Sequence, residues 1–190
     1  MSESQTHIET PPQKIKLERV TTEGLILDIG GGGEGLVSRI EGERVCALDI
    51  RMSEIKEAQI HGNSSNWFVA DGGHLCFKDS VFDTVTLWFS LGFMSDWNTK
   101  RTVLEEAYRV LKRNGKLSIL ASRIPEIGDS LIFWVTFTFP DGTLSKTGYG
   151  LRGGQNQTLP RILEIVSEVG FDLHQCEDHG EWFKVESQKS

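Results

Sequence analysis

The chain has 190 residues, of which 38% are hydrophobic and 25% charged, and its formal net charge is −7. This length and composition are typical of a single globular domain, and the negative charge argues against a nucleic-acid backbone as the main partner. We expect no membrane span and no signal peptide, because no apolar run is long enough and residues 1–13 are polar. The three cysteines, Cys46, Cys76 and Cys176, are scattered and odd in number, which indicates reduced thiols in a cytoplasmic protein.

Short apolar runs alternate with helix-like stretches, and this pattern predicts an α/β fold with a parallel sheet. Residues 1–20 form a polar segment that we expect to be partly disordered, fraying as far as Pro11-Pro12, ahead of one domain over residues 21–190. Asn114-Gly115 predicts a turn before the fifth strand. The strands are expected at residues 25–29, 44–49, 67–70, 82–89 and 116–121.

Helices are expected between these strands wherever apolar residues recur on one face. One is expected over residues 33–40, a second over 54–60 with Ser53 as its N-cap, and a third from Asn98 or Thr99 to about residue 111. The last elements are predicted to be a helix over residues 159–169, capped by Thr158 with Pro160 in its first turn, and an antiparallel pair over residues 171–176 and 182–186.

The stretch of residues 124–158 is less regular than the rest. Residues 131–139 are rich in β-branched and aromatic side chains, which favours a strand, although periodicity alone leaves a helix open. A turn is predicted at residues 140–142, and four glycines after it predict a flexible loop. These glycines are Gly148, Gly150, Gly153 and Gly154.

The most informative stretch is residues 25–35, in which an apolar strand with Asp28 near its end opens into a glycine-rich loop. Such a loop lets a ligand approach the backbone, and Asp49, about 20 residues on, can accept hydrogen bonds from a ribose diol. Gly30, Gly32 and Gly35 also fit the G-x-G-x-x-G pattern of dehydrogenases, so a nicotinamide-dependent oxidoreductase stays open. Asp28 would repel a pyrophosphate and attract the cationic groups of S-adenosylmethionine, which favours S-adenosylmethionine over a nicotinamide dinucleotide.

With these motifs the chain resembles the class I S-adenosylmethionine-dependent methyltransferases, of the small-molecule type that includes the quinone-biosynthesis C-methyltransferases. The resemblance covers residues 25–120 and is specific because several motifs occur in the family's order. Glu34 stands at the third glycine position of the first motif, which leaves the loop register open by one residue, and Cys76 stands where proline is common. The motifs are residues 27–32, 47–50, 69–72, 75–77, 80–85 and 107–117.

The resemblance implies a Rossmann-like three-layer α/β/α sandwich. Its seven-stranded sheet would be mostly parallel, with an antiparallel last strand and the order 3-2-1-4-5-7-6. It also implies binding of S-adenosylmethionine, in which Asp28 holds the amino group, Asp49 both ribose hydroxyls and Asp71 the adenine amino group. The glycine backbone would pass the carboxypropyl chain, and apolar side chains would flank the adenine. The other implied cofactor-binding residues are Gly30, Gly31, Gly32, Ile50, Gly72, Leu75 and Trp88.

The expected reaction is methyl transfer to a small, apolar or aromatic acceptor, which leaves S-adenosylhomocysteine. Alignment in a dry pocket is the main requirement, and His74 and Tyr149 are candidates for a base or an orienting group. Residues 88–93 replace the tetrapeptide of methyltransferases that act on planar nitrogen, and Trp88 and Phe89 in this stretch face either the acceptor or the core. Arg152 is a candidate for holding an anion.

Two further functions stay open beside this one, the oxidoreductase and a non-catalytic S-adenosylmethionine-binding sensor or partner subunit. A homodimer or a partner subunit that completes the pocket is also open. We expect no metal, since zinc sites draw on two separated ligand pairs and the chain has a single cluster. That cluster comprises His174, Cys176, Asp178 and His179.

Overall fold

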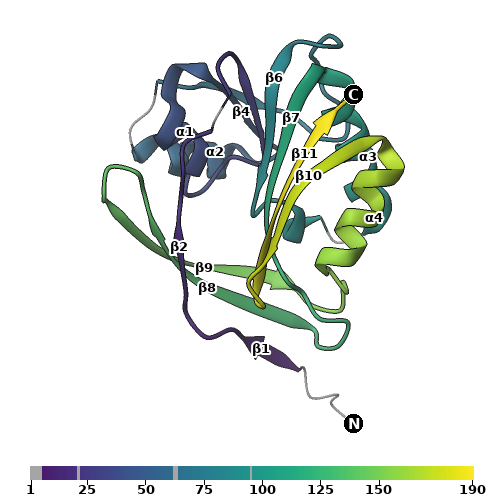
Figure 1. Ribbon diagram of the computed structural model, residues 1–190. Coiled ribbons are helices and arrows are strands. Elements are labelled where there is room, and N and C mark those ends of the chain that lie inside the picture. The colour runs from purple at the N-terminus through teal and green to yellow at the C-terminus, as the bar shows by residue number, and fades with distance from the viewer. Residues whose placement is uncertain (1–5, 21, 62–63, 95) are drawn as a thin grey trace.

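The computed structural model describes residues 6–20, 22–61, 64–94 and 96–190. Its centre is a seven-stranded sheet (Figure 1). When its strands are numbered one to seven in chain order and read from β5, the spatial order is 3-2-1-4-5-7-6. The first five strands in this order are parallel, whereas β11 runs antiparallel to β7 and to β10. The predicted sheet is therefore confirmed. The strands, in spatial order, are β10 (Phe171–Asp178), β11 (Trp182–Lys189), β7 (Leu111–Ser122), β6 (Phe82–Trp88), β3 (Ile26–Ile29), β4 (Val45–Asp49) and β5 (Asn66–Val69).

Helices cover both faces of this sheet, which confirms the three-layer arrangement (Figure 1). Successive side chains of β3 point to opposite faces of the sheet. Leu27 and Ile29 enter the core beneath α3 and α4, whereas Ile26 packs with Val37 of α1 on the other face. Within the described residues no helix has both the length and the apolar character needed to cross a membrane. The helices are α1 (Leu36–Glu41), η1 (Gly42–Arg44), α2 (Met52–Ile60), η2 (Leu91–Phe93), α3 (Trp97–Val110) and α4 (Leu159–Val169).

The first two expected helix starts are wrong. Helix α1 begins at Leu36 rather than residue 33, because Gly35 at its N-cap has a left-handed backbone with φ 58°. Helix α2 is preceded by Arg51 rather than capped by Ser53. The Arg51 N–H donates to the Asp49 carboxylate at 2.9 Å, so an acid at the strand end fixes the start of this helix.

The third helix also starts earlier than expected. Asp96, rather than Asn98 or Thr99, is the N-cap of α3, and its carboxylate accepts the Thr99 N–H at 2.8 Å. The turn expected at Asn114-Gly115 is an irregularity inside β7, where Asn114 has φ 62° and the pairing with β6 shifts register. The limits of α4 and its Thr158 N-cap are confirmed, and the predicted C-terminal strand pair is present.

A second sheet lies below the carboxyl ends of the parallel strands (Figure 1). Strands β1 (His7–Glu9) and β2 (Gln13–Lys16) both pair in parallel with β8 (Ser130–Thr138), and β9 (Leu144–Arg152) pairs antiparallel with β8. The expectation that the chain frays as far as Pro11-Pro12 is therefore wrong from His7 onward. The prolines separate β1 from β2 because proline has no N–H to donate. Residues 1–5 lie outside the described residues.

Strand β9 replaces the flexible loop that its glycines predicted. Gly148 serves packing, since a Cβ at this position would lie 2.6 Å from the Trp134 ring of the neighbouring strand. The strand expected over residues 131–139 is confirmed as β8, and its inner face, with Phe133 and Phe137, forms a second core with Phe89 at the end of β6. The β8–β9 hairpin is thereby fixed against the central domain.

Candidate functional site

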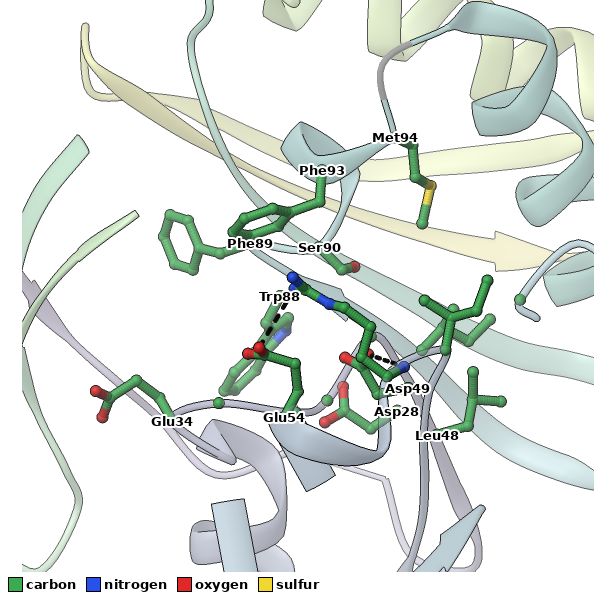
Figure 2. A pocket seen from close by; sticks show the side chains of 18 of the residues that line it. Asp28, Glu34, Leu48, Asp49, Glu54, Trp88, Phe89, Ser90, Phe93 and Met94 are labelled. Atoms are coloured by element: carbon green, nitrogen blue, oxygen red, sulfur yellow. Dashed lines mark hydrogen bonds and ion pairs between the residues drawn. The ribbon is translucent and has the colours of Figure 1, made fainter. Parts of the chain in front are cut away.

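A cavity of about 670 Å³ lies at the carboxyl ends of the first strands, between the central sheet and β9. It has two halves, as Figure 2 shows, with Asp28, Asp49 and Glu54 on one side and Phe89, Phe93 and Met94 on the other. The acidic half is lined by Asp28, Asp49, Ile50, Arg51, Glu54, Glu57, Asp71 and the glycine loop. The aromatic half is lined by Trp88, Phe89, Ser90, Phe93, Met94, Val103, Thr147 and Tyr149.

The glycine loop joins β3 to α1 and leaves no room for side chains at Gly30, Gly31 and Gly32. The Gly30 and Gly31 N–H groups both donate to the Leu48 carbonyl of β4, at 2.9 and 3.0 Å. A Cβ on Gly31 would lie 2.3 Å from the Asp28 carboxylate, and one on Gly32 would lie 2.7 Å from the Asp49 carboxylate. Backbone alone therefore fits between the two acids, and all three of the predicted glycines line the cavity.

Glu34 interrupts the glycines of this loop. Gly33 and Gly35 on either side of it take the left-handed backbone, with φ 65° and 58°. The Glu34 side chain points away from the loop backbone and accepts the Ser145 hydroxyl of β9 at 2.5 Å, with Arg39 at 3.5 Å. The departure from the family pattern thus connects the glycine loop to the hairpin.

Asp28 is the most perturbed acid of the site. It is 2% exposed, and the Thr86 hydroxyl of β6 donates to its Oδ1 at 2.7 Å. Burial raises its pKa to about 7; the nearby Asp49 charge adds to the shift and the Thr86 hydrogen bond opposes it. A cation placed beside this carboxyl would favour its ionised form.

The other residues predicted for the cofactor fall into two groups. Asp49, Ile50, Asp71 and Gly72 all line the cavity, where parallel strands β4 and β5 end. Leu75 is not among the described lining residues; it belongs to the core beneath α3, and its N–H donates to Glu106 at 2.7 Å. The structure thus brings the strand-end acids together and places Leu75 elsewhere.

The two candidate catalytic residues lie in different environments. The His74 side chain is 84% exposed, lies 3.4 Å from Asp71, and is not among the described lining residues. Tyr149 lines the aromatic half, where its ring stacks on Phe89 with centroids 5.6 Å apart. Burial raises the Tyr149 pKa far above its usual value, so the phenol keeps its proton at neutral pH.

Trp88 lines the cavity, and its indole N–H donates to Ser118 at 3.0 Å. Arg152, which the sequence made a candidate anion ligand, is exposed and is not among the described residues of the cavity wall. Sequence reasoning also missed several lining residues, because the motifs give no signal for side chains that reach the cavity from the start of α2, from the segment after β6 and from β9. These are Arg51, Glu54, Met94, Thr147 and, as a polar group, Ser90.

Charge in the cavity favours a cationic ligand. Among the described lining residues seven are acidic and one, Arg51, is basic, and Arg51 itself pairs with Glu54 at 3.6 Å. The C-terminal cluster has other partners, since His174 bonds Gln188 at 2.6 Å and Arg123 holds Asp178 at 2.8 Å. No group of three potential metal ligands occurs within the described ranges.

Comparison with known proteins identifies the family. Residues 27–119 match the methyltransferase domain family. The chain is 35% identical over 168 residues to the demethylmenaquinone methyltransferase of Thermotoga maritima, covering 78% of this chain and 70% of that protein. The chain belongs to the class I S-adenosylmethionine-dependent methyltransferases. The cofactor of this family is S-adenosylmethionine, and the acid-lined glycine cavity suits its positive charge.

Two further likenesses agree with this assignment. The chain is 35% identical over 157 residues to the ubiquinone/menaquinone biosynthesis C-methyltransferase of Klebsiella pneumoniae, covering 76% of this chain but 54% of that protein. A crystal structure of an S-adenosylmethionine-dependent methyltransferase from Methanosarcina mazei shares the fold, with a TM-score of 0.67 at 17% identity over 90% of this chain and 94% of that one. The chain thus spans about half to two thirds of the length of these quinone-pathway relatives.

Proposed function

We propose that the protein transfers the methyl group of S-adenosylmethionine to a small apolar or aromatic acceptor. The observation that carries this proposal is one cavity that joins an acidic half to an aromatic half. The acidic half suits a cationic nucleoside, and the aromatic half suits a flat apolar ring. The names of the quinone-pathway relatives support a quinone-like acceptor that is methylated on carbon.

In this proposal each strand-end acid binds a different group of the cofactor. Asp49 accepts both ribose hydroxyls, Asp28 accepts from the ammonium group, and Asp71 accepts from the adenine amino group. Asp71 already accepts the Gly73 N–H with one oxygen at 2.9 Å, which orients its carboxylate. The glycine backbone leaves room for the carboxypropyl chain, and Ile50, 66% exposed on the cavity wall, packs against the adenine.

The sulfonium of S-adenosylmethionine supplies an activated methyl group. An electron pair of the acceptor forms a bond to the methyl carbon while the sulfur–carbon bond breaks, and S-adenosylhomocysteine leaves. The chain's own residues align the acceptor and exclude water, since Phe89, Phe93 and Met94 form an apolar wall. Tyr149 stays protonated and therefore donates a hydrogen bond instead of acting as a base. A hydroquinone, phenol or enol acceptor therefore loses its hydroxyl proton to solvent before the transfer, and the carbon that gains the methyl group loses its own proton to solvent afterwards.

Two other functions predict different binding behaviour. A nicotinamide-dependent oxidoreductase must hold a diphosphate, which the acidic half disfavours because Arg51 is the single basic residue among the described lining residues. A sensor or partner subunit would bind S-adenosylmethionine without transferring its methyl group. Both alternatives are separated from methyl transfer by the experiment below.

The test combines calorimetry with a labelled-methyl assay. Asp49→Ala removes the proposed ribose ligand and should weaken S-adenosylmethionine binding by about tenfold to a hundredfold, because charge-assisted hydrogen bonds are lost. Asp172→Ala on β10, an exposed acid away from the cavity, is the matched control and should leave the affinity unchanged. Unchanged affinity in Asp49→Ala, or tight NADH binding by the wild type, would refute the cofactor assignment. Binding without transfer to phenols, thiols or hydroquinones would favour the sensor.

We also infer a reducing compartment, the cytoplasm, because Cys46, Cys76 and Cys176 are all free thiols. The small-molecule acceptor and the net charge of −7 favour a protein that does not act on nucleic acid. A homodimer or a partner subunit stays a prediction, which sedimentation of the purified chain would test.

A further inference from the structure

Ser90 presents a buried hydroxyl that no group of the described residues uses. The residue is 5% exposed and lines the cavity, and its Oγ has no hydrogen-bond partner among the described residues. Figure 2 shows it between the aromatic half and the acids, at the carboxyl end of β6. A buried polar group without a partner costs about 1–3 kcal/mol, so native proteins seldom keep one without a reason.

The local backbone explains why this hydroxyl is uncommitted. Ser90 stands at the N-cap of η2, where a serine oxygen usually accepts an amide N–H, yet its side chain makes no capping bond. Its backbone, with φ −85° and ψ −31°, is helical rather than the extended backbone of a capping serine, and its carbonyl accepts the Phe93 N–H at 3.1 Å. Ser90 therefore stands at the N-cap while its hydroxyl makes no capping hydrogen bond.

The residue before it turns the chain out of the strand. Phe89 has φ 59°, a left-handed conformation that is costly for a bulky side chain. Its N–H donates to the Leu120 carbonyl at 2.6 Å, and its ring stacks against both Phe133 and Tyr149, with a centroid distance of 5.6 Å to each. Strand alternation would send Phe89 to the side of Leu87, beneath α3, but it packs in the second core. Tertiary packing thus holds a strained turn immediately before Ser90.

Ser90 stands at the junction of the two halves. A Cβ on Gly30 would lie 2.5 Å from the Ser90 Cβ, so the residue abuts the first glycine of the cofactor loop. On the aromatic side, Asp96 is already used, because its two oxygens accept the Thr99 N–H and hydroxyl at 2.8 and 2.5 Å. Ser90 therefore lies between the glycine loop and the aromatic half, where the proposed function places the methyl group and the acceptor.

We propose that the Ser90 hydroxyl hydrogen-bonds an oxygen of the methyl acceptor, next to the atom that receives the methyl group, and so selects oxygenated aromatic acceptors. This inference rests on the proposed methyl transfer. The hydroxyl donates to a phenolate or enolate oxygen, or accepts from a hydroxyl, and Tyr149 offers a second donor from β9. Ser90 acts as a specificity-determining residue, because the methyl transfer itself needs no proton from it.

The experiment compares Ser90→Ala with Ser38→Ala. Ser38 on α1 is also buried, at 4% exposure, with no partner for its Oγ among the described residues, but it is not among those that line the cavity. The probes are 1,4-dihydroxynaphthalene, which has the oxygen, and thiophenol, which does not. Ser90→Ala should raise KM for dihydroxynaphthalene about tenfold, the loss of one hydrogen bond, and leave KM for thiophenol and the Kd for S-adenosylmethionine within twofold. Ser38→Ala should change none of these values.

Two other kinetic results would contradict the proposal. A weaker Kd for S-adenosylmethionine with an unchanged KM for dihydroxynaphthalene would assign Ser90 to the cofactor, and equal effects in Ser38→Ala would reduce Ser90 to a packing role. If the wild type transfers no methyl group, direct titration of dihydroxynaphthalene into the complex with S-adenosylhomocysteine still decides. Weaker binding by Ser90→Ala than by the wild type supports the proposal, while equal binding or none by the wild type overturns it.

Discussion

A carboxyl that is half protonated near neutral pH makes ligand binding depend on pH. The Asp28 pKa is raised to about 7, mainly because the side chain is buried. Its unfolded value is 3.8, so the folded chain holds a proton that the unfolded chain releases, and the free energy of unfolding falls as pH rises from about 4 to about 7. A bound ammonium group reverses the preference, because it attracts the carboxylate.

Binding of S-adenosylmethionine should therefore release a proton below pH 7 and tighten as pH rises. At pH 6 roughly one tenth of Asp28 is ionised, so we expect affinity to increase up to about tenfold between pH 6 and pH 8. Calorimetry in two buffers of different ionisation enthalpy measures both affinity and proton release. Asp28→Asn should bind more weakly at pH 8 and lose this pH dependence. A wild type whose affinity is flat across the range would contradict the role of Asp28.

Sequence reasoning located the acids of the site better than its neutral groups. Asp28, Asp49 and Asp71 each follow or end an apolar run, and parallel strands end at one edge, so their meeting could be foreseen. Ser90 could not, because its availability depends on the left-handed turn at Phe89, which distant packing imposes. Leu75 has the right motif position, but its side chain fills the core.

At the scale of elements, a buried lysine fastens the β8–β9 hairpin to the domain. Lys100 of α3 is fully buried, and its Nζ donates to the side-chain oxygens of Gln155 and Gln157, at 2.8 and 2.5 Å. These glutamines in turn donate to the Gly92 and Ser122 carbonyls, both at 2.8 Å. Burial, helped by the nearby Arg161 charge, lowers the Lys100 pKa to about 7. The chain returning from β9 is thus bound to α3, η2 and β7.

Lys100→Met should lower the free energy of unfolding by about 2 kcal/mol, because two buried amide oxygens lose their donor. It should also lower methyl transfer more than S-adenosylmethionine affinity, since the hairpin supplies the acceptor wall. Denaturant unfolding and calorimetry check the two effects. Lys56→Met, at an exposed position on α2, is the control and should be near neutral. Equal stability of Lys100→Met and the wild type would show that the glutamines find other donors.

The hairpin shows where element prediction succeeded and failed. β8 was foreseen from its β-branched and aromatic residues, and it is a strand from Ser130 to Thr138. β9 was not, because Gly148 and Gly150 indicate a loop by composition. The Trp134 ring occupies the space beside Gly148, and such a cross-strand contact leaves no signal in the local sequence.

At the scale of the whole molecule, the N-terminal strands belong to the fold. Ile15 and Leu17 are 3% and 2% exposed and enter the second core, and the Leu17 N–H donates to Thr138 at 2.9 Å. The order of the central sheet followed from the family motifs. The second sheet did not, because pairing of β1 and β2 with β8 joins positions more than 100 residues apart, as in His7 with Ser130.

Removing residues 1–16 should expose the edge of β8 and part of the second core. We expect a lower Tm, faster amide exchange in β8 and a tendency to aggregate, because an uncovered strand edge pairs with other chains. Removing residues 1–9 takes away β1 alone and should have a smaller effect. Thermal unfolding, hydrogen exchange and size-exclusion chromatography measure these outcomes. If both truncated chains melt like the full chain, the N-terminal strands add no stability.

The two-part origin of the acceptor wall has a consequence for chimeric enzymes. β9 borders the cavity, but its sheet is completed by β1 and β2, which lie near the N-terminus of the sequence. A graft of residues 124–158 from a relative would meet foreign edges at β1 and β2, whereas a graft that also carries residues 7–16 keeps its native neighbours. We therefore expect acceptor preference to transfer only when both segments are exchanged together, and recombination that separates them should yield proteins that bind the cofactor without a working acceptor site.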